Sequence, residues 1–330
     1  MKAAFQHKLR DGKIRCDLCP HHCVLADGES GLCKARVVRD GELLASCYGI
    51  ISSAALDPVE KKPLYHFYPG RMIYSIGGWG CNFECSFCQN WTISQQVDRE
   101  GRSYSPDRAV REAVRLKSIG IAYTYNEPLV GFEFVRDCAE EAKRAGLVNV
   151  LVTNGYVVEK PAAELIQFID ALNIDIKSMD DGFYRETCHG RLEPVLNFAR
   201  QSSDAGCHVE ITNLVIPGMN DETGNFEKLA CWICDNLGRK TPLHLSAYRP
   251  EYKLRTGSTS TALLEKGHDI CRRYLDYVYV GNVQTDTGQD TACPECSALL
   301  VKRRGYLTDV SGIENGKCTH CRRPADFVGL

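Results

Sequence analysis

Three cysteines, Cys81, Cys85 and Cys88, lie within eight residues and follow the pattern Cys-x3-Cys-x2-Cys. A structural zinc site uses four protein ligands, and a cubane iron–sulfur cluster is usually bound by four thiolates. Three thiolates on one loop leave one iron of a cubane cluster open, and a substrate can bind directly to an open iron. The spacing therefore indicates either a cluster with an exchangeable ligand or part of a zinc site that a histidine or a distant cysteine completes.

The residues before these cysteines indicate where the loop lies in the fold. The run from Met72 to Ile76 has the pattern of a buried strand. Gly77, Gly78 and Gly80 allow the chain to turn sharply from the end of that strand. Because α/β folds place their chemistry at the carboxyl ends of the strands, we expect the cysteines at that edge of a sheet.

The residues around the cysteines also resemble a known family. Phe87 directly before the last cysteine, together with the spacing, is similar to the radical S-adenosylmethionine (SAM) superfamily, and the following Gln89-Asn90 resembles its pyruvate formate-lyase activating enzyme branch. Residues 57–70 (DPVEKKPLYHFYPG), followed by this loop, resemble the radical SAM member of the AmmeMemoRadiSam system, and the similarity extends over nearly the whole chain. The resemblance implies that Cys81, Cys85 and Cys88 bind a [4Fe-4S] cluster. It also implies that the amino and carboxylate groups of SAM chelate the free iron, and that reduction of the cluster then cleaves SAM to methionine and a 5′-deoxyadenosyl radical.

Length, charge and cysteine content limit the class of protein. The 330 residues are enough for one large α/β domain with appendages, and the net charge of −2 gives no bulk attraction to nucleic acid. The sequence has no apolar stretch of about 20 residues and no signal core at residues 1–7, so we expect a cytoplasmic protein without a membrane partner. In a reducing compartment, many of the 18 cysteines are expected to be metal ligands and not disulfides.

Strand-like and helix-like segments alternate from residue 71 onward, which predicts a parallel sheet covered by helices. Six or seven such units suit an open or partial (β/α) barrel, and the resemblance implies six units. We expect an N-terminal cysteine-rich extension at 1–70, the radical SAM barrel at 71–285 and a zinc-ribbon-like segment at 286–330. The expected strands are 72–76, 121–125, 147–152, 171–176, 207–216, 243–248 and 277–280. The expected helices start at Ser105-Pro106-Asp107 and Pro161, and cover about 130–145, 193–205, 222–237 and 260–275.

Polar residues follow the expected strands, as a barrel mouth that binds the zwitterion SAM requires. The resemblance places Asn126 and Glu127 where activating enzymes meet the methionine ammonium, although the two glycines of that segment are replaced here. It places Asn154 in a Thr-Asn-Gly match, and Asp175 and Lys177 in a match to Asp-Leu-Lys. We expect Lys177 near the SAM carboxylate, and Phe87 beside the cofactor.

Four cysteines near the N-terminus form a second cluster, with Pro20 and Gly31 providing turns. Four thiolates at these short spacings suit a closed site for zinc or for an accessory iron–sulfur cluster. Two further readings are a site in which His21 or His22 replaces one cysteine, and a group of cysteines that binds no metal. The cluster consists of Cys16, Cys19, Cys23 and Cys33.

The C-terminal segment contains two Cys-x2-Cys knuckles that resemble a zinc ribbon. A tetrahedral zinc ion would fold this segment, which has too little apolar core to be stable alone. The run from Arg303 to Leu307 between the knuckles has the character of a hairpin strand. The expected ligands are Cys293, Cys296, Cys318 and Cys321.

The sequence as a whole predicts a radical SAM enzyme of oxidoreductase or lyase type that abstracts hydrogen from an unknown substrate. An electron donor such as flavodoxin or ferredoxin is implied, and protein partners of the AmmeMemoRadiSam system are suggested. Thr212 stands where activating enzymes carry an arginine, so the substrate stays open. One alternative is a glycyl-radical-enzyme activase of the pyruvate formate-lyase activating type, and another is a non-catalytic metal-binding scaffold.

Overall fold

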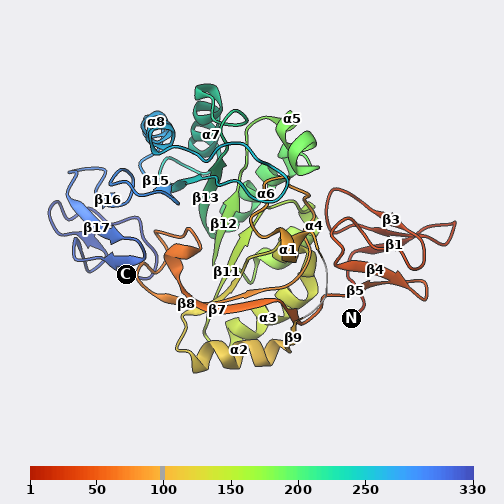
Figure 1. Ribbon diagram of the computed structural model, residues 1–330. Coiled ribbons are helices and arrows are strands. Elements are labelled where there is room, and N and C mark those ends of the chain that lie inside the picture. The colour runs from red at the N-terminus through yellow and green to blue at the C-terminus, as the bar shows by residue number, and fades with distance from the viewer. Residues whose placement is uncertain (97–100) are drawn as a thin grey trace.

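The structure is a computed structural model that describes residues 1–96 and 101–330 (Figure 1). Its centre is an eight-stranded sheet in the order β15-β14-β13-β12-β11-β10-β8-β7. All neighbouring strands from β8 to β15 pair in parallel, and β7 pairs antiparallel with β8 at the edge. The strands are β7 (Ser53–Pro58), β8 (Met72–Gly77), β10 (Gly120–Tyr123), β11 (Val148–Thr153), β12 (Ala171–Asp175), β13 (His208–Val215), β14 (Leu243–Ala247) and β15 (Val278–Gly281).

Six long helices connect successive parallel strands, so six strand–helix units precede β15, and the expected partial barrel is confirmed. The helix starts follow local chemistry. In the helix that begins at Pro106, this proline occupies the first turn and the Ser105 hydroxyl accepts the Arg108 N–H at 3.2 Å. The third helix begins at Glu159, two residues before the expected Pro161. The helices are α2 (Pro106–Arg115), α3 (Phe132–Arg144), α4 (Glu159–Ile166), α6 (Leu192–Asp204), α7 (Thr223–Asn236) and α8 (Thr261–Cys271).

The two faces of the sheet have different neighbours. One face packs on the helices through a large apolar core. The other, concave face packs near the amino ends of its strands against residues 59–70, where Leu64 and Phe67 meet Ile73, Ala122 and Val150. The segment begins with a turn of 3-10 helix, η1 (Val59–Lys61). Residues 59–70 therefore form a floor inside the partial barrel.

Buried polar contacts fix this floor. The fully buried Glu210 carboxylate on β13 accepts the backbone N–H groups of Tyr65 at 3.0 Å and His66 at 2.7 Å. It also bonds the rings of His208 at 2.9 Å and His244 at 2.6 Å. Burial alone would raise the pKa of Glu210, but the two histidines hold the pKa well below its usual range. One carboxylate thus joins the floor segment to two strands.

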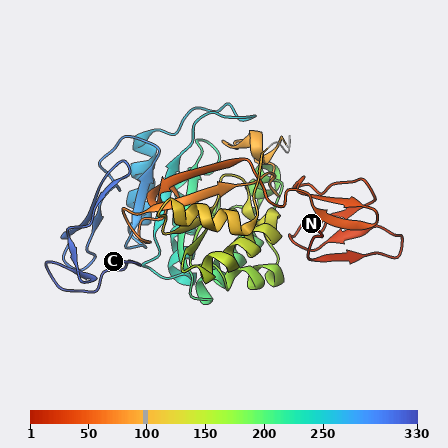
Figure 2. The same cartoon turned by 90° about the horizontal axis from the view of Figure 1, so that it is seen from below.

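Two small β modules lie at opposite ends of the barrel (Figures 1 and 2). Short elements near the cluster loop are α1 (Trp91–Ser94), η2 (Pro128–Gly131), α5 (Asp181–Phe183) and η3 (Tyr184–Cys188). No helix within the described ranges combines the length and the apolar character needed to cross a bilayer. The N-terminal strands are β1 (Gln6–Lys8), β2 (Ile14–Cys16), β3 (Val24–Leu25), β4 (Arg36–Arg39), β5 (Glu42–Ala45) and β6 (Ile50–Ile51), which pairs with β9 (Arg102–Ser103). The C-terminal strands are β16 (Thr291–Ala292), β17 (Leu299–Arg304), β18 (Leu307–Asp309), β19 (Ile313–Glu314) and β20 (Lys317–Cys318).

Candidate metal and cofactor site

The three-cysteine loop begins where β8 ends, at the carboxyl edge of the parallel strands. A Cβ atom on Gly77 would lie 2.8 Å from the Thr124 carbonyl oxygen, so the adjacent strand ends come together only with glycine there. Gly80 has a φ of +89°, in the left-handed region that glycine adopts readily. These glycines explain how the chain turns off the strand and over its end.

Two aromatic residues anchor the loop. Phe83 and Phe87 are buried, and so is Cys85, whereas Cys81 and Cys88 are partly exposed. The Phe83 ring packs on Tyr156 with 4.8 Å between ring centres. The loop therefore has fixed hydrophobic supports, and part of its sulfur-bearing side remains accessible.

The Cys81 sulfur accepts hydrogen bonds from the Phe83 backbone N–H at 3.3 Å and from the Asn154 side chain at 3.6 Å. The Asn154 amide also donates to the Asn82 side-chain oxygen at 2.9 Å. Burial raises the pKa of Cys81, so without metal the thiol stays protonated, and metal binding would release the proton. N–H donors at a ligand sulfur are one means by which proteins tune iron–sulfur clusters, so this surrounding fits such a ligand.

A fourth cysteine, Cys188, lies beside Cys85 and was not recognised in the sequence. Cys188 is fully buried, and its carbonyl accepts the Glu84 backbone N–H at 3.1 Å. The Cys188 thiol lowers the pKa of Cys85, and Lys177 lowers it further, while burial opposes both. Nothing in the spacing of Cys188, about one hundred residues after the loop, marks this proximity.

Asn126 ties the loop to the end of β10. Its side-chain oxygen accepts the Gly78 N–H at 2.9 Å, and its amide donates to the Gly80 carbonyl at 3.0 Å. Both sides of the amide are therefore engaged by the turn that leads into the cysteines. This geometry makes Asn126 a positioning residue for the loop, and a direct contact to SAM stays a prediction.

Glu127 is 3% exposed and its carboxylate accepts three hydrogen bonds. The donors are Leu129 N–H at 2.9 Å, the Thr153 hydroxyl at 2.7 Å and Asn154 N–H at 2.8 Å. Burial nevertheless raises the pKa of Glu127 to about 7. The side chain joins the ends of β10 and β11, and its expected contact with the SAM ammonium also stays a prediction.

Lys177 and Asp175 stand together at the end of β12. The Lys177 ammonium lies 3.1 Å from the Asp175 carboxylate and 5.8 Å from the centre of the Phe87 ring. Burial alone would lower the pKa of Lys177, but Asp175, Cys85 and Cys188 raise it well above its usual value. A fixed cation therefore lies next to the three-cysteine loop, which suits a ligand that carries a carboxylate.

Two buried hydroxyl groups lie on the same concave face. Thr212 pairs with Asp175 in the sheet register, and Ser75 lies on β8 between Ile73 and Gly77. Within the described part of the chain, the Thr212 side-chain oxygen has no hydrogen-bond partner, whereas Ser75 interacts with Tyr125. Buried polar atoms usually have partners, so the Thr212 hydroxyl fits a site for a polar ligand such as SAM or a substrate.

A buried ion pair lies next to this face. The Lys62 ammonium, whose side chain is 2% exposed, bonds Asp57 at 2.7 Å and lies 4.6 Å from the centre of the Tyr125 ring. The Tyr125 hydroxyl donates to Asp57 at 2.6 Å. Burial would raise the pKa of Asp57, but Lys61, Lys62 and Tyr125 hold the pKa well below its usual range. Residues 57–62 thus connect the floor of the barrel to the end of β10.

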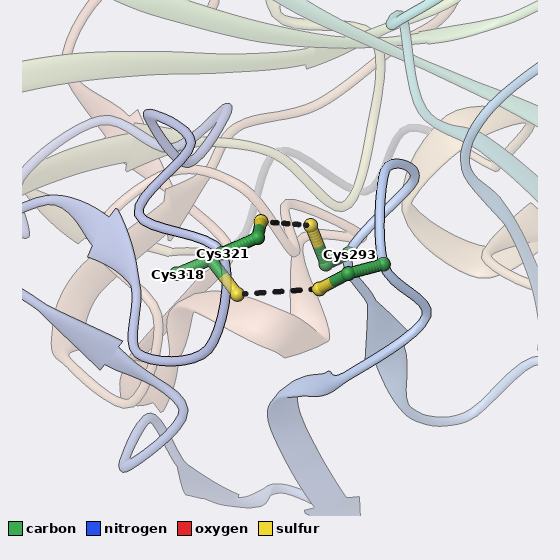
Figure 3. A group of neighbouring side chains, drawn as sticks. Cys293, Cys318 and Cys321 are labelled. Carbon is green, nitrogen blue, oxygen red and sulfur yellow. Dashed lines mark hydrogen bonds between the residues drawn. The ribbon is translucent and has the colours of Figure 1, made fainter.

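The C-terminal cysteines meet in one cluster (Figure 3). All four sulfurs lie within 4.8 Å of one another, with Cys293–Cys321 at 3.6 Å and Cys296–Cys318 at 3.7 Å. Four sulfurs bound to one zinc ion at about 2.3 Å are about 3.8 Å apart, so these distances fit a tetrahedral ion. The Cys321 backbone amide, with the neighbouring thiols, lowers the pKa of Cys318 to about 6, which favours the thiolate that a metal needs.

The N-terminal cysteines also come together. Cys16, Cys19, Cys23 and Cys33 line one cavity, together with His21 and Arg36. The Arg36 guanidinium is 1% exposed and pairs with the buried Glu133 carboxylate at 2.6 Å. The cavity borders the three-cysteine loop, because a Cβ atom on Gly80 would lie 2.3 Å from the Cys33 carbonyl oxygen.

The family model of the radical SAM superfamily matches residues 76–230, which include the three-cysteine loop and the strands from β10 to β13. An uncharacterized protein of Methanocaldococcus jannaschii is 41% identical over 333 residues, and the match covers 99% of each chain. The pyruvate formate-lyase 1-activating enzyme of Escherichia coli K12 is 24% identical over 180 residues, which cover 51% of this chain and 71% of that enzyme. A domain of pyruvate-formate lyase-activating enzyme from Bacteroides vulgatus aligns with a TM-score of 0.44 and 22% identity, and covers 49% of this chain and 99% of that domain.

Proposed function

Because the chain carries a radical SAM domain related to the pyruvate formate-lyase activating enzymes, we propose that it cleaves SAM reductively and abstracts hydrogen from a substrate. The observation that carries this proposal is the Cys81–Cys88 loop at the carboxyl end of β8, with Lys177 beside it. A metal-binding scaffold without catalysis would not need the Lys177 cation just after β12 and, on the neighbouring strand, the Thr212 hydroxyl that has no partner within the described ranges.

Each residue of the site has a separate role in the proposed reaction. Cys81, Cys85 and Cys88 would hold a [4Fe-4S] cluster, which, when bound, supplies the electron that cleaves SAM to methionine and a 5′-deoxyadenosyl radical. The Lys177 ammonium would bind the methionine carboxylate, and Asp175 keeps that ammonium in place at 3.1 Å. Asn154 donates to Cys81 and so orients the ligand sulfur. The floor at residues 59–70 closes the amino end of the barrel, which limits the access of water from that side.

The C-terminal segment and an external electron donor also have roles in the proposed function. Cys293, Cys296, Cys318 and Cys321 would hold one zinc ion that stabilises the C-terminal segment. A low-potential one-electron donor, such as flavodoxin or ferredoxin, would reduce the cluster. The protein would act in the cytoplasm, and the segment DPVEKKPLYHFYPG supports a place in the AmmeMemoRadiSam system.

A second candidate function is activation of a glycyl-radical enzyme. The similarity to enzymes named as pyruvate formate-lyase activating enzymes supports it. Thr212 weighs against a simple transfer, because a hydroxyl group stands here where the resemblance leads us to expect an arginine on that strand. A glycyl-radical signal on a co-incubated partner would distinguish this function from modification of a small molecule.

The test is SAM cleavage by the anaerobically reconstituted and reduced protein. We expect 5′-deoxyadenosine and methionine from the unaltered chain and none above background from Cys85→Ala. Cys138→Ala, which removes a fully buried thiol from α3, is the matched control and should retain cleavage. Equal cleavage by Cys85→Ala, or no cleavage by an unaltered chain with a full cluster, would contradict the proposal.

A further inference from the structure

Apart from Val130, every residue that lines the cavity at the N-terminal module precedes the range that the radical SAM family model matches. Zinc, an iron–sulfur cluster, a histidine ligand and no metal are all compatible with the cysteine spacing alone. We infer that this cavity binds a second iron–sulfur cluster of the four-iron, four-sulfide type. Its ligands are Cys16, Cys19, Cys23 and Cys33.

The distances between sulfurs separate the two metal types. The C-terminal cysteines bring all four sulfurs within 4.8 Å of one another, as one tetrahedral ion requires. In the described part of the chain, no three of the N-terminal sulfurs are this close together. These sulfurs surround a cavity instead. In a cubane cluster each thiolate binds a different iron, so the ligand sulfurs stand farther apart with the cluster between them.

A buried hydrogen-bond donor also points to a cluster. Arg36 lines the cavity, and its terminal nitrogen lies 4.0 Å from the Cys16 sulfur. The Arg36 Nε–H group is buried and has no acceptor among the described residues. An iron–sulfur cluster brings inorganic sulfides that accept hydrogen bonds, whereas a zinc ion brings no acceptor. Because the guanidinium is paired with the Glu133 carboxylate at 2.6 Å, it contributes a hydrogen-bond donor to the cavity and no net charge.

Backbone amides approach the ligand sulfurs, as they do around metal-bound thiolates. The Leu18, His21 and Ala35 amides interact with the Cys16, Cys19 and Cys33 sulfurs, respectively. The Nε2 of His21 donates to the Asn82 carbonyl at 2.7 Å and is therefore not open to a metal, and the four cysteines already fill four ligand positions. Four thiolates, oriented amides and a buried guanidinium donor thus form a complete site without a histidine.

The test uses a chain that cannot form the radical cluster. Cys81→Ala/Cys85→Ala/Cys88→Ala is reconstituted anaerobically with iron and sulfide. We expect about four irons and four acid-labile sulfides per chain, with a charge-transfer absorption band and a paramagnetic signal on reduction that SAM does not alter. Adding Cys19→Ser/Cys23→Ser should remove both iron and absorption.

A matched control and a measurement on the unaltered chain complete the test. Cys231→Ser/Cys234→Ser changes another Cys-x2-Cys pair, on α7, and should leave the iron count unchanged. The unaltered chain should hold about eight irons and one zinc, and about four irons with two zincs would overturn the inference even if the triple variant does not fold. A folded triple variant with zinc at this site and no sulfide would overturn it as well. Because the triple variant lacks the radical cluster, its iron count does not depend on whether the proposed function holds.

Discussion

Replacing Glu210 by glutamine should weaken the floor of the barrel. One carboxylate oxygen accepts the His66 N–H and contacts His208, and the other accepts the Tyr65 N–H and contacts His244. Glutamine keeps one oxygen, but it presents an NH2 group to the backbone N–H and the histidine that the second carboxylate oxygen bonds in the unaltered protein. A histidine can change tautomer to accept this group, but a backbone N–H cannot. One buried donor then loses its acceptor, and the charge-assisted bonds are lost too, which together cost about 3 kcal/mol of unfolding free energy.

The assay is urea unfolding of the reconstituted protein at pH 7, followed by circular dichroism. Glu112→Gln, on the exposed face of α2 beside Arg115, is the control and should change the unfolding free energy by less than about 0.5 kcal/mol. A loss below about 1 kcal/mol for Glu210→Gln would refute the reasoning. The folded-state pKa of Glu210 is depressed, so its contribution is complete above the unfolded pKa of about 4.3 and declines as the pH falls through the folded value. The difference between the two proteins should therefore shrink in acid.

Three further predictions concern the candidate SAM site, the turn before Cys81 and the C-terminal zinc site. Lys177→Ala should weaken SAM binding at least about tenfold in calorimetry, because a charge-assisted bond is lost. Lys177→Arg should keep part of the affinity. Unchanged affinity in both variants would exclude the contact between Lys177 and the SAM carboxylate. Asn126→Ala should release the turn before Cys81 and lower the iron retained after gel filtration, whereas full retention would show that the turn holds without it. Cys296→Ser/Cys318→Ser should remove about one zinc per chain and lower the thermal midpoint, and a zinc count equal to that of the unaltered chain would contradict the C-terminal site.

The parallel part of the sheet could be predicted because each strand is a short apolar run between turn residues. The run Met72–Ile76 is confirmed in β8, and Ser105-Pro106 begins α2 as its capping chemistry requires. Tyr125 was expected inside a strand, but β10 ends at Tyr123 and Tyr125 has a φ of +74°. The Tyr125 hydroxyl bonds Asp57, a contact across 68 residues that local propensity cannot indicate.

The antiparallel edge strand β7 was not predicted. Its sequence, SAALDP, has small residues and a terminal proline in place of an alternating β-branched pattern. The strand forms because it pairs with β8 along its whole length, from Ser53–Gly77 to Pro58–Met72. Tertiary pairing therefore decided the structure where propensity was weak.

The candidate site likewise contains some residues that the sequence could indicate and others that it could not. The three-cysteine spacing and the C-terminal knuckles are local patterns, so the sequence could indicate both. The buried Cys188 beside Cys85 depends on packing between distant segments, which no spacing records. The Glu127 carboxylate illustrates a further limit, because a polar residue at a strand end can serve the backbone around it and still look like a ligand.

The strand order of the sheet has a consequence for how the chain folds during synthesis. Leaving aside β9, which pairs with β6, each strand from β8 to β15 pairs with the next one along the chain, so the sheet can grow during synthesis. The floor segment at 59–70 emerges early, yet His66 bonds Tyr279 and the Asp326 carbonyl, and Tyr65 accepts from Arg303. These partners come from β15 and the residues after it. The contacts of the floor can therefore form in two stages. Leu64 and Phe67 can pack on β8, β10 and β11, and Glu210 can bind the backbone of residues 65 and 66, before residues 279–326 add the contacts to His66 and Tyr65.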